Sequence, residues 1–496
     1  MLYTSTRDKR VRVSSAEAIT HGISADGGLF VPETIPQLSA DDLARLASLD
    51  YKGRAKEILS LYLTDFSQKE IDDCVEGAYA DGKFSSPKTA PLHKLADGSH
   101  VLELWRGPTC AFKDMALQLL PHLLTVSAGK AAGGKQIVIL VATSGDTGKA
   151  ALEGFRDVPN TQIMVFYPSD GVSPMQKLQM TTQEGANVAV CAIKGNFDDA
   201  QTGVKKIFTD PAVAQKLAQK NKMFSSANSI NWGRLVPQIV YYVSAYCDLL
   251  ADGEISNGDA INVVVPTGNF GNILAAYYAK EMGVPIRRLI CASNRNKVLT
   301  DFIETGVYDR RREFYCTSSP SMDILISSNL ERLLFLLCGM DDAQTKTWMR
   351  ELSEQGVYDV GSDMHKRIAD VFFGGYCDED ATKALIRTVY EQEGYLCDTH
   401  TAVAVQVYRD YAAATGDRTP SVIASTASPY KFSKTVLAAV APDVCAADEF
   451  GMVDALLEKT GFPCPKQLLE LKDKTVRFTQ CCTRETMEDA VLRAML

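Results

Sequence analysis

The chain has 496 residues, of which 46% are hydrophobic and 23% are charged, and this composition is typical of a folded globular protein rather than a disordered or fibrous one. The length predicts about three domain-sized units. The 52 lysine and arginine residues against 61 aspartate and glutamate residues give a net charge of −9, which argues against nucleic acid as a partner, because binding a phosphate backbone requires surplus positive charge.

The sequence also predicts the cellular compartment of the protein. The longest apolar runs, such as residues 137–142, fall far short of the roughly 18 residues that a membrane-spanning helix needs, and the polar N-terminal residues show no secretory signal. The 13 cysteines are scattered without a C-x-x-C spacing, and the six histidines show no H-E-x-x-H pairing, so no metal site is predicted. We therefore expect a cytoplasmic protein with reduced cysteines and no membrane partner.

Along the chain, residues 1–90 are predicted to form a mainly helical N-terminal unit. Helical patterns at 40–48 and 53–64 follow a turn-rich segment at 26–32, and the polar residues 81–87 end the unit. From about residue 100, short apolar runs rich in β-branched residues alternate with amphipathic helical patterns, which is typical of α/β units around a parallel sheet. The clearest predicted strands are 137–142, 162–167, 187–193, 261–266, 287–292 and 421–425.

Lys113 lies in an apolar segment where a lysine is unexpected. Residues 103–120 are predicted to form a strand end, a Gly-Pro turn and a helix that begins near Thr109. A lysine near the positive end of a helix, among apolar neighbours, is favoured in its neutral form. A neutral amine is the nucleophile that Schiff-base chemistry with pyridoxal phosphate requires. The alternative is a lysine that extends along an apolar helix into solvent.

Two strand–loop–helix units share one design. The strand at 137–142 leads through the loop 143–148 into a helix at 149–155, and the strand at 261–266 leads through the loop 267–272 into a helix at 273–282. Such loops present backbone N–H groups to an anion at a positive helix end, although the same residue types also cap helices that bind nothing. Neither loop contains G-x-G-x-x-G, and Ala150 stands where a P-loop has a hydroxyl residue, so ATP and NAD sites are not predicted.

Ordered segments over nearly the whole chain resemble the pyridoxal-phosphate enzymes of the tryptophan synthase β type (fold type II), and among them the threonine synthase family with an extra N-terminal domain. These segments are residues 3–7, 25–33, 107–114, 143–148, 226–232, 267–272 and 425–432. The resemblance implies an α/β fold of two parallel-sheet lobes with a mainly helical N-terminal domain. It divides the chain into an N-terminal domain at 1–90, a catalytic core at 91–440 and a C-terminal segment at 441–496 that packs on the core.

The resemblance also implies the roles of individual residues. Lys113 would hold pyridoxal 5'-phosphate as a Schiff base and would later move the α-proton of the substrate. The cofactor phosphate would be held by Gly268, Asn269, Phe270, Gly271 and Asn272. Thr426 would meet the pyridine nitrogen, or Ser425 would do so if the strand register is shifted by one residue.

The substrate would be bound by two segments. The first is the loop of Thr143, Ser144, Gly145, Asp146, Thr147 and Gly148, in which Ser144, Gly145, Thr147 and Gly148 would take its carboxylate. The second consists of Asn228, Ser229, Asn231 and Arg234, which would bind its phosphate. Asp146 stands where the wider family often has Asn near the cofactor, so we expect its carboxylate to turn away or to bind a loop N–H. The segment 315–324 also resembles the family, but its residues predict only a capped helix start.

The family's activity, implied by the resemblance, is that of a lyase that converts O-phospho-L-homoserine and water to L-threonine and phosphate, as a monomer or a homodimer. Two alternatives stay open. One is a phospho-lyase that takes the same substrate and releases 2-oxobutyrate, ammonia and phosphate. The other is a homologue that binds the cofactor without turnover, against which the intact Lys113 and both loops argue.

Overall fold

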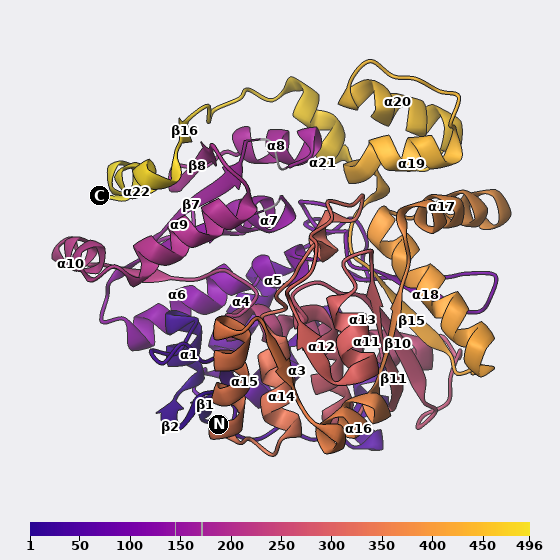
Figure 1. Cartoon of the computed structure of the whole chain (residues 1–496), viewed down its shortest axis with the longest axis horizontal. Coiled ribbons are helices and arrows are strands. Elements are labelled where there is room, and N and C mark those ends of the chain that lie inside the picture. Colours follow the sequence, from indigo (N-terminus) through magenta and orange to yellow (C-terminus); the bar gives the residue numbers. More distant parts are fainter. Residues whose placement is uncertain (144, 170–171) are drawn as a thin grey trace.

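The computed structural model describes residues 1–143, 145–169 and 172–496 (Figure 1). Two sheets, each flanked by helices, form its two lobes. The smaller sheet has the order β16-β8-β7-β6-β9 and is parallel, and the larger sheet has the order β14-β11-β10-β15-β5-β4, in which only the β4–β5 pair is antiparallel. The predicted α/β class is therefore confirmed.

All of the strands predicted from the apolar runs are present. The smaller sheet contains β6 Gln136–Ala142, β7 Thr161–Pro168, β8 Val188–Ile193, β9 Lys222–Ser225 and β16 Cys481–Cys482. The larger sheet contains β4 Leu92–Lys94, β5 His100–Glu103, β10 Ile261–Pro266, β11 Ile286–Ser293, β14 Phe372–Tyr376 and β15 Ser421–Ser425. Strands β12 Val307–Asp309 and β13 Val357–Asp359 form a separate antiparallel pair.

Helices cover both sheets. Those of the first half are α5 Asp114–Leu117, α6 Leu120–Ala131, α7 Asp146–Phe155, α8 Pro174–Thr181, α9 Phe197–Thr209, α10 Pro211–Gln219, α11 Trp232–Ala251 and α12 Gly271–Glu281. Those of the second half are α13 Val298–Thr305, α14 Leu330–Leu337, α15 Asp342–Glu354, α16 Ser362–Val371, α17 Glu379–Glu393, α18 Thr399–Thr415 and α19 Ser433–Val440. Short 3-10 turns lie at η1 Pro320–Met322 and η2 Pro429–Phe432. No helix in the described ranges is long and apolar enough to cross a membrane.

The N-terminal segment combines a small sheet with helices. Its elements are β1 Tyr3–Ser5, β2 Asp8–Val13, β3 Phe30–Pro32, α1 Ser15–His21, α2 Ala40–Ala47, α3 Tyr51–Tyr62 and α4 Gln68–Ala78. Tyr3 and Tyr62 pack against Trp232 of α11, with ring centroids 5.3 Å and 5.6 Å away. The apolar side chains of this segment therefore belong to the same hydrophobic core as α6 and α11. The predicted domain limits stay a prediction.

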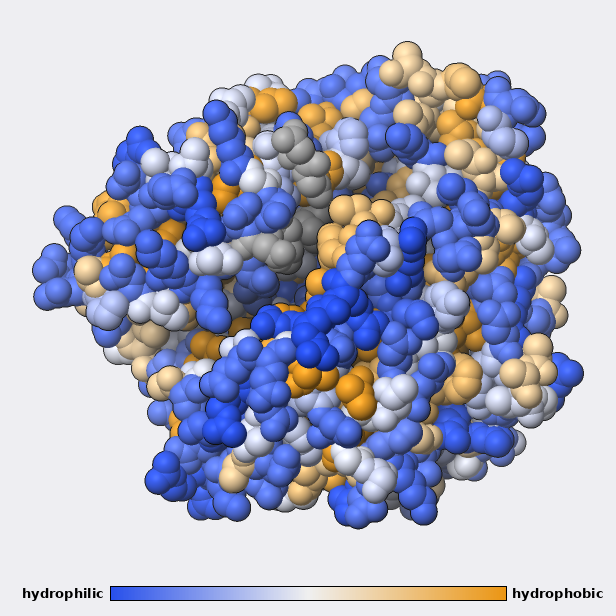
Figure 2. All heavy atoms as spheres, viewed as in Figure 1, coloured by the Kyte–Doolittle hydropathy of each residue, from blue (hydrophilic) through white to orange (hydrophobic). Residues whose placement is uncertain are grey.

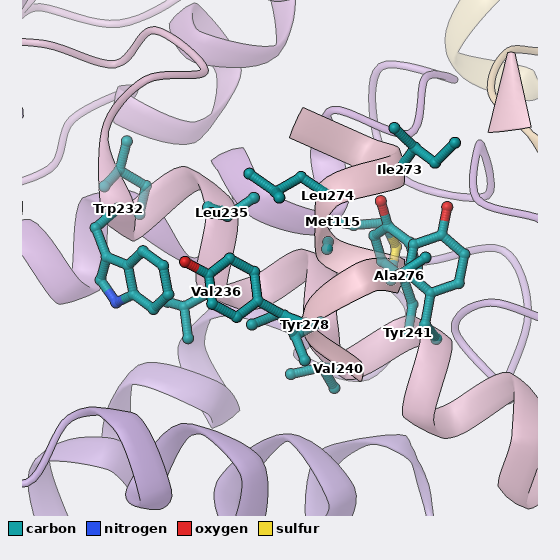
Figure 3. Close-up of a cluster of buried hydrophobic side chains, with 14 of the residues drawn as sticks. Met115, Trp232, Leu235, Val236, Val240, Tyr241, Ile273, Leu274, Ala276 and Tyr278 are labelled. Atoms are coloured by element: carbon teal, nitrogen blue, oxygen red, sulfur yellow. The ribbon is translucent and has the colours of Figure 1, made fainter. Parts of the chain in front are cut away.

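Helices α11 and α12 form the centre of this core. α11 is buried along almost its whole length, and Figure 3 shows its residues Leu235, Val236 and Val240 among Leu274 and Tyr278 of α12. Met115 of α5 belongs to the same cluster (Figure 3). Buried apolar contacts thus hold the segment that carries Lys113 against α11 and α12.

The helix predicted near Thr109 begins later than expected. Residues 109–113 form an irregular turn, in which Cys110 has φ 59°, and α5 begins only at Asp114, with Lys113 at its cap. The carboxylate of Asp114 accepts hydrogen bonds from the backbone N–H and the hydroxyl of Thr109, at 2.8 Å and 2.6 Å. The prediction was wrong because Thr109 lies before the helix. Its N–H and hydroxyl donate to Asp114, which is the first residue of α5.

The C-terminal segment also contributes to both lobes. α20 Glu449–Thr460, α21 Lys466–Leu469, η3 Glu470–Asp473, η4 Arg484–Thr486 and α22 Met487–Met495 are its helices and turns. β16 adds a parallel edge strand to β8, and Met487 and Val491 of α22 pack on the smaller sheet. In Figure 1 this yellow segment runs over the upper surface of the molecule, from α19 to the C-terminus beside the smaller sheet.

A glycine contact between α7 and α5 provides a test of this fold. A Cβ built on Gly154 of α7 would overlap the carbonyl oxygen of Leu117 in α5, whereas a Cβ on the exposed Gly129 of α6 would meet nothing within 4 Å. Gly154→Ala should therefore lower the free energy of unfolding by about 2 kcal/mol, although alanine is the better helix former. Gly129→Ala should raise it by up to about 1 kcal/mol.

Urea unfolding of the two variants measures both effects. A Gly154→Ala protein that is as stable as Gly129→Ala would contradict the close packing of α5 on α7.

Candidate active site

Three neighbouring strands of the larger sheet end at one edge. β15 lies between β5 and β10, and all three run parallel. The carboxyl ends of β5, β15 and β10 lead to Lys113, to Thr426 and to the loop 267–272, in that order. The backbone N–H of Phe112 donates to the carbonyl oxygen of Thr426 at 2.8 Å. This edge is where ligands bind in open α/β sheets, and the structure brings the predicted lysine and loop together there.

Lys113 is largely enclosed at this edge, with 11% of its side chain exposed. Its Nζ donates to Oγ of Ser321 at 3.3 Å and lies 3.7 Å from Oδ2 of Asp146. Burial lowers the pKa of Lys113 to about 8, against the opposing effect of Asp146, and the cations of Lys431 and Arg234 add to the lowering. A substantial fraction of the amine is therefore neutral near physiological pH, as nucleophilic chemistry requires.

Asp146 faces the site, so the expectation that it turns away was wrong. Its Oδ1 pairs with Nζ of Lys431 at 2.6 Å and accepts a hydrogen bond from Nε2 of Gln176 at 2.9 Å. The lysine cations hold the pKa of this buried carboxyl well below its ordinary value. Asp146 is therefore a stable anion inside the site. The sequence could not show this, because Lys431 comes from a distant part of the chain.

The loop after β6 is held together by Thr143. Its Oγ1 accepts hydrogen bonds from the N–H groups of Gly145 and Gly148, at 3.0 Å and 2.9 Å. These two N–H groups are therefore not free to bind a substrate carboxylate, which corrects the role predicted for Thr143, Gly145 and Gly148. The side chain of Thr147, by contrast, forms no hydrogen bond within the described residues and lies in the first turn of α7. Ser144 lies outside the described residues.

The loop after β10 forms a cradle at the start of α12. Phe270 adopts a left-handed conformation, with φ 61°, and caps the helix. The carbonyl oxygen of Asn269 accepts hydrogen bonds from the backbone and side-chain nitrogens of Asn329, at 3.2 Å and 3.0 Å. A Cβ on Gly268 would overlap the carbonyl oxygen of Ser321. The close approach of Ser321 and the hydrogen bonds from Asn329 thus fix the shape of this loop.

The cradle keeps free space and a free donor. A Cβ on Gly271 would meet only side-chain atoms of Asn329 and Gln238, none nearer than 3.4 Å. Oδ1 of Asn272 accepts hydrogen bonds from the hydroxyls of Tyr241 and Tyr242, at 2.6 Å each, but the buried Nδ2 has no partner among the described residues. A buried amide donor without a partner, at the positive end of a helix, is suited to an anion such as a phosphate.

The two hydroxyls at the end of β15 differ in their hydrogen bonds. Oγ of Ser425 accepts hydrogen bonds from Nε1 of Trp105 at 3.1 Å and from the hydroxyl of Thr401 at 2.9 Å. The hydroxyl of Thr426 forms no hydrogen bond within the part of the chain that the structure describes. The register ambiguity between the two residues therefore favours Thr426 as the ligand.

The predicted phosphate-binding residues around residue 230 behave differently from one another. Asn231 caps α11 through Gly233, and its Nδ2 donates to the carbonyl oxygens of Ile19 and Ser226, so its side chain is fully used and the predicted ligand role is not supported. Arg234 is 3% exposed, donates from Nη1 to the carbonyl oxygen of Ala227, and leaves Nε without a partner in the described ranges. Burial lowers its pKa to about 10.

Arg234 is the strongest anion candidate in this segment. No carboxylate of the described residues pairs with it, and a buried guanidinium that keeps an unused donor calls for an anionic ligand. Asn228 and Ser229 are half-buried beside it in sequence, and Oγ of Ser229 lies 3.4 Å from Nδ2 of Asn329. These three residues stay compatible with the predicted phosphate site.

Several residues at the site were missed from the sequence. Besides Lys431, Ser321 bonds Lys113, and His400 accepts the N–H of Ser321 at 3.1 Å while its Nδ1 lies 2.8 Å from Asp398. Ser321 and Lys431 lie in segments that resemble the family, which was the only signal for them. For His400 the sequence gives no signal, because one histidine without a spaced partner predicts neither a metal site nor a catalytic role.

The site as a whole carries surplus positive charge. Lys431 and Arg234 are buried here, Lys113 is 11% exposed, and Asp146 is the carboxylate next to the two lysines. In Figure 2 the surface is recessed near the centre of this face, where the two halves of the molecule meet. The geometry thus combines a partly neutral lysine with donors for several anionic groups.

Comparisons with known proteins agree with this arrangement. Family models described as "Threonine synthase N terminus", "Pyridoxal-phosphate dependent enzyme" and "Threonine synthase, C-terminal" match residues 2–79, 90–426 and 401–491. Threonine synthase-like 1 of Homo sapiens is 41% identical over 436 residues, which are 86% of this chain and 58% of that protein. Threonine synthase of Schizosaccharomyces pombe is 36% identical and aligns over 88% of both chains.

Solved structures extend the likeness to the whole fold. The crystal structure of PLP-bound threonine synthase from Brucella melitensis is 35% identical and superposes with a TM-score of 0.88 over 100% of this chain and 99% of that one. This chain spans 58% of the length of the human threonine synthase-like 1 protein.

The lowered pKa of Lys113 can be tested in the purified protein without ligands. The rate at which an amine-acylating reagent labels Lys113 should rise with pH and reach half its maximum near pH 8, because only the neutral amine reacts. Lys69, an exposed lysine whose pKa the neighbouring Asp73 raises, should reach half its maximum at a clearly higher pH. Mass spectrometry of the labelled peptides measures both profiles, and coinciding profiles would contradict the assigned environment of Lys113.

Proposed function

Because the chain belongs to the threonine synthase family of pyridoxal-phosphate dependent enzymes, we propose that it binds pyridoxal phosphate and converts O-phospho-L-homoserine and water to L-threonine and inorganic phosphate. The observation that carries the proposal is the buried, partly neutral amine of Lys113 beside an anion cradle. Pyridoxal phosphate acts as an electron sink that stabilises the negative charge left when a substrate loses its α-proton.

The residues present fit this cofactor. The first N–H groups of α12 and the unused Nδ2 of Asn272 would hold its phosphate, in the space that the absent side chain of Gly271 leaves open. Lys113 would bind its aldehyde, and the hydroxyl of Thr426 would contact its ring nitrogen. A neutral hydroxyl there does not stabilise a protonated ring, in contrast to a carboxylate.

The remaining donors suit a substrate with two anionic ends. Arg234, Asn228 and Ser229 would bind the substrate phosphate, since a guanidinium and neutral donors match a dianion. The N–H groups at the start of α7 and the hydroxyl of Thr147 would bind its carboxylate, in place of the N–H groups of Gly145 and Gly148 that Thr143 occupies. Lys113 would then be the base that carries the α-proton, because its pKa of about 8 lies near the working pH.

A phospho-lyase is the second candidate function. The identity of 41% to proteins named threonine synthase-like 1 exceeds the 36% identity to the fission yeast threonine synthase. The two outcomes differ in where water and protons reach a shared intermediate, and they differ in product: 2-oxobutyrate and ammonia in place of threonine.

The proposal also includes the coarser organisation of the protein. The division at 1–90, 91–440 and 441–496 is supported by the order of elements, and a cytoplasmic location is supported by thiols that are unpaired throughout the described residues. We retain a monomer or a homodimer as the assembly state. Sedimentation of the purified protein would decide between the two.

Incubation with O-phosphohomoserine tests the activity directly. With the cofactor present, the protein should release phosphate and threonine in equal amounts with no 2-oxobutyrate, and borohydride reduction should fix the cofactor on Lys113. Lys113→Ala should lose product formation by at least about a thousandfold, because both the covalent attachment and the base are removed. Equal amounts of phosphate and 2-oxobutyrate would establish the lyase instead, and a cofactor fixed on another lysine would overturn the site.

Gly271 tests the phosphate cradle separately from catalysis. Gly271→Ala should weaken cofactor affinity by at least about tenfold, since the new methyl group fills the open space, while the urea midpoint stays unchanged or rises because alanine favours the helix. Gly268→Ala is the contrasting variant, and it should lower the urea midpoint because a Cβ there overlaps Ser321. A Gly271→Ala protein with the affinity of the original would show that the phosphate binds elsewhere.

A further inference from the structure

Lys431 is a buried lysine in the site that the proposed chemistry does not use. It lies in the turn η2 and is fully buried. Its Nζ donates to the carbonyl oxygen of Thr109 at 3.1 Å and pairs with Oδ1 of Asp146 at 2.6 Å. Both partners belong to segments that border Lys113. Lys431 is therefore fixed in place by two other parts of the site.

Asp146 connects the two lysines unequally. Its Oδ1 is occupied by Lys431 and by Gln176, whereas its Oδ2 faces Lys113 at the longer distance of 3.7 Å. A carboxylate at this position adds one negative charge next to the reactive amine, and Lys431 supplies the compensating positive charge.

The other groups around the two lysines do not provide this compensation. Arg234 of α11 also acts on Lys113, as a second cation, and the neutral Ser321 bonds Lys113 and connects it to His400. Around Lys431 lie Asp114 and the thiol of Cys110, besides Asp146. Without Lys431, Asp146 would be a buried carboxylate whose nearest cation is Lys113, and this would hold a proton on the reactive amine.

We propose that Lys431 and Asp146 form a positioning pair in which Lys431 takes up the charge of Asp146, so that the amine of Lys113 can lose its proton while it stays held in place. Lys431 touches neither reacting atoms nor ligand in this role: it compensates the charge of Asp146 and, as a second cation, repels a proton on Lys113. The proposal rests on the proposed function only in taking Lys113 as the lysine that binds the cofactor. It predicts that the charges at positions 146 and 431 are coupled.

The pH dependence of the visible absorption band of the lysine-bound cofactor measures this coupling in the holoenzyme. Asp146→Asn removes the carboxylate and leaves the cation, so the titration midpoint should fall by about one pH unit or more. Lys431→Met leaves the carboxylate without its partner, so the midpoint should rise by a similar amount. The double variant Asp146→Asn with Lys431→Met should return close to the original midpoint, and Lys431→Arg should keep it.

Lys149 provides the matched control. It is another buried lysine, 8% exposed, which pairs with Glu153 at 3.0 Å on α7, outside the site. Lys149→Met should lower thermal stability, as the loss of any buried pair would, but should leave the titration midpoint unchanged. If Lys431 had only a structural role, Lys431→Met would likewise lower thermal stability and leave the titration midpoint unchanged.

The outcomes separate this inference from the proposed function. If borohydride does not fix the cofactor on Lys113 in the original protein, the proposed function fails. If borohydride does fix the cofactor on Lys113, an unchanged titration midpoint in Asp146→Asn overturns the inference. This test holds even if Lys431→Met does not fold. The inference is also overturned if Asp146→Asn and Lys431→Arg both lose cofactor binding while Lys149→Met keeps it. A pair that only sets the protonation state of Lys113 is not required for cofactor binding.

Discussion

The burial of positive charge is the constraint on which the rest of this structure depends. Arg234, Arg332 and Lys431 are taken out of water and Lys113 nearly so, and removing a cation from water is costly unless other groups replace the solvent. Carbonyl oxygens of irregular segments do much of this: Arg234 donates to Ala227 and Lys431 donates to Thr109. The loops at the sheet edges are therefore shaped by the cations that they solvate. An anionic ligand bound at the proposed site would add to this compensation and would thereby stabilise the fold.

Arg332 shows how far this solvation extends. Its Nε donates to the carbonyl oxygen of Phe30 at 2.9 Å, its Nη2 to that of Ile230 at 2.6 Å, and its Nη1 to Oδ1 of Asn329 at 2.5 Å. Asn329 in turn holds the cradle residue Asn269. One buried guanidinium thus joins the N-terminal segment, the segment around residue 230 and the cradle. The N-terminal segment is thus linked to the loops of the site through Arg332, and its apolar side chains belong to the same core as the rest of the chain.

The sequence predicted what depends on local pattern and failed where a partner comes from far along the chain. The strands β6, β10 and β15 and the two loops follow from apolar runs bordered by small polar residues, and Lys113 could be singled out by its apolar neighbours. Asp146 was misplaced because Lys431 was not known to face it. Asn231 was assigned to a ligand because its bond to Ile19 of α1 is invisible in the sequence. The N–H groups of Gly145 and Gly148 were counted as free although Thr143 binds both.

The order of strands has a consequence for how the chain is made. β15 is inserted between β5 and β10, so both of these strands keep an unpaired edge from the time residue 266 leaves the ribosome until residues 421–425 follow. The smaller sheet likewise receives its last strand, β16, only near the C-terminus. The larger sheet therefore cannot close before residues 421–425 are made. Exposed strand edges of this kind are prone to pair with other chains, so the interval before β15 forms is when this fold is most open to aggregation.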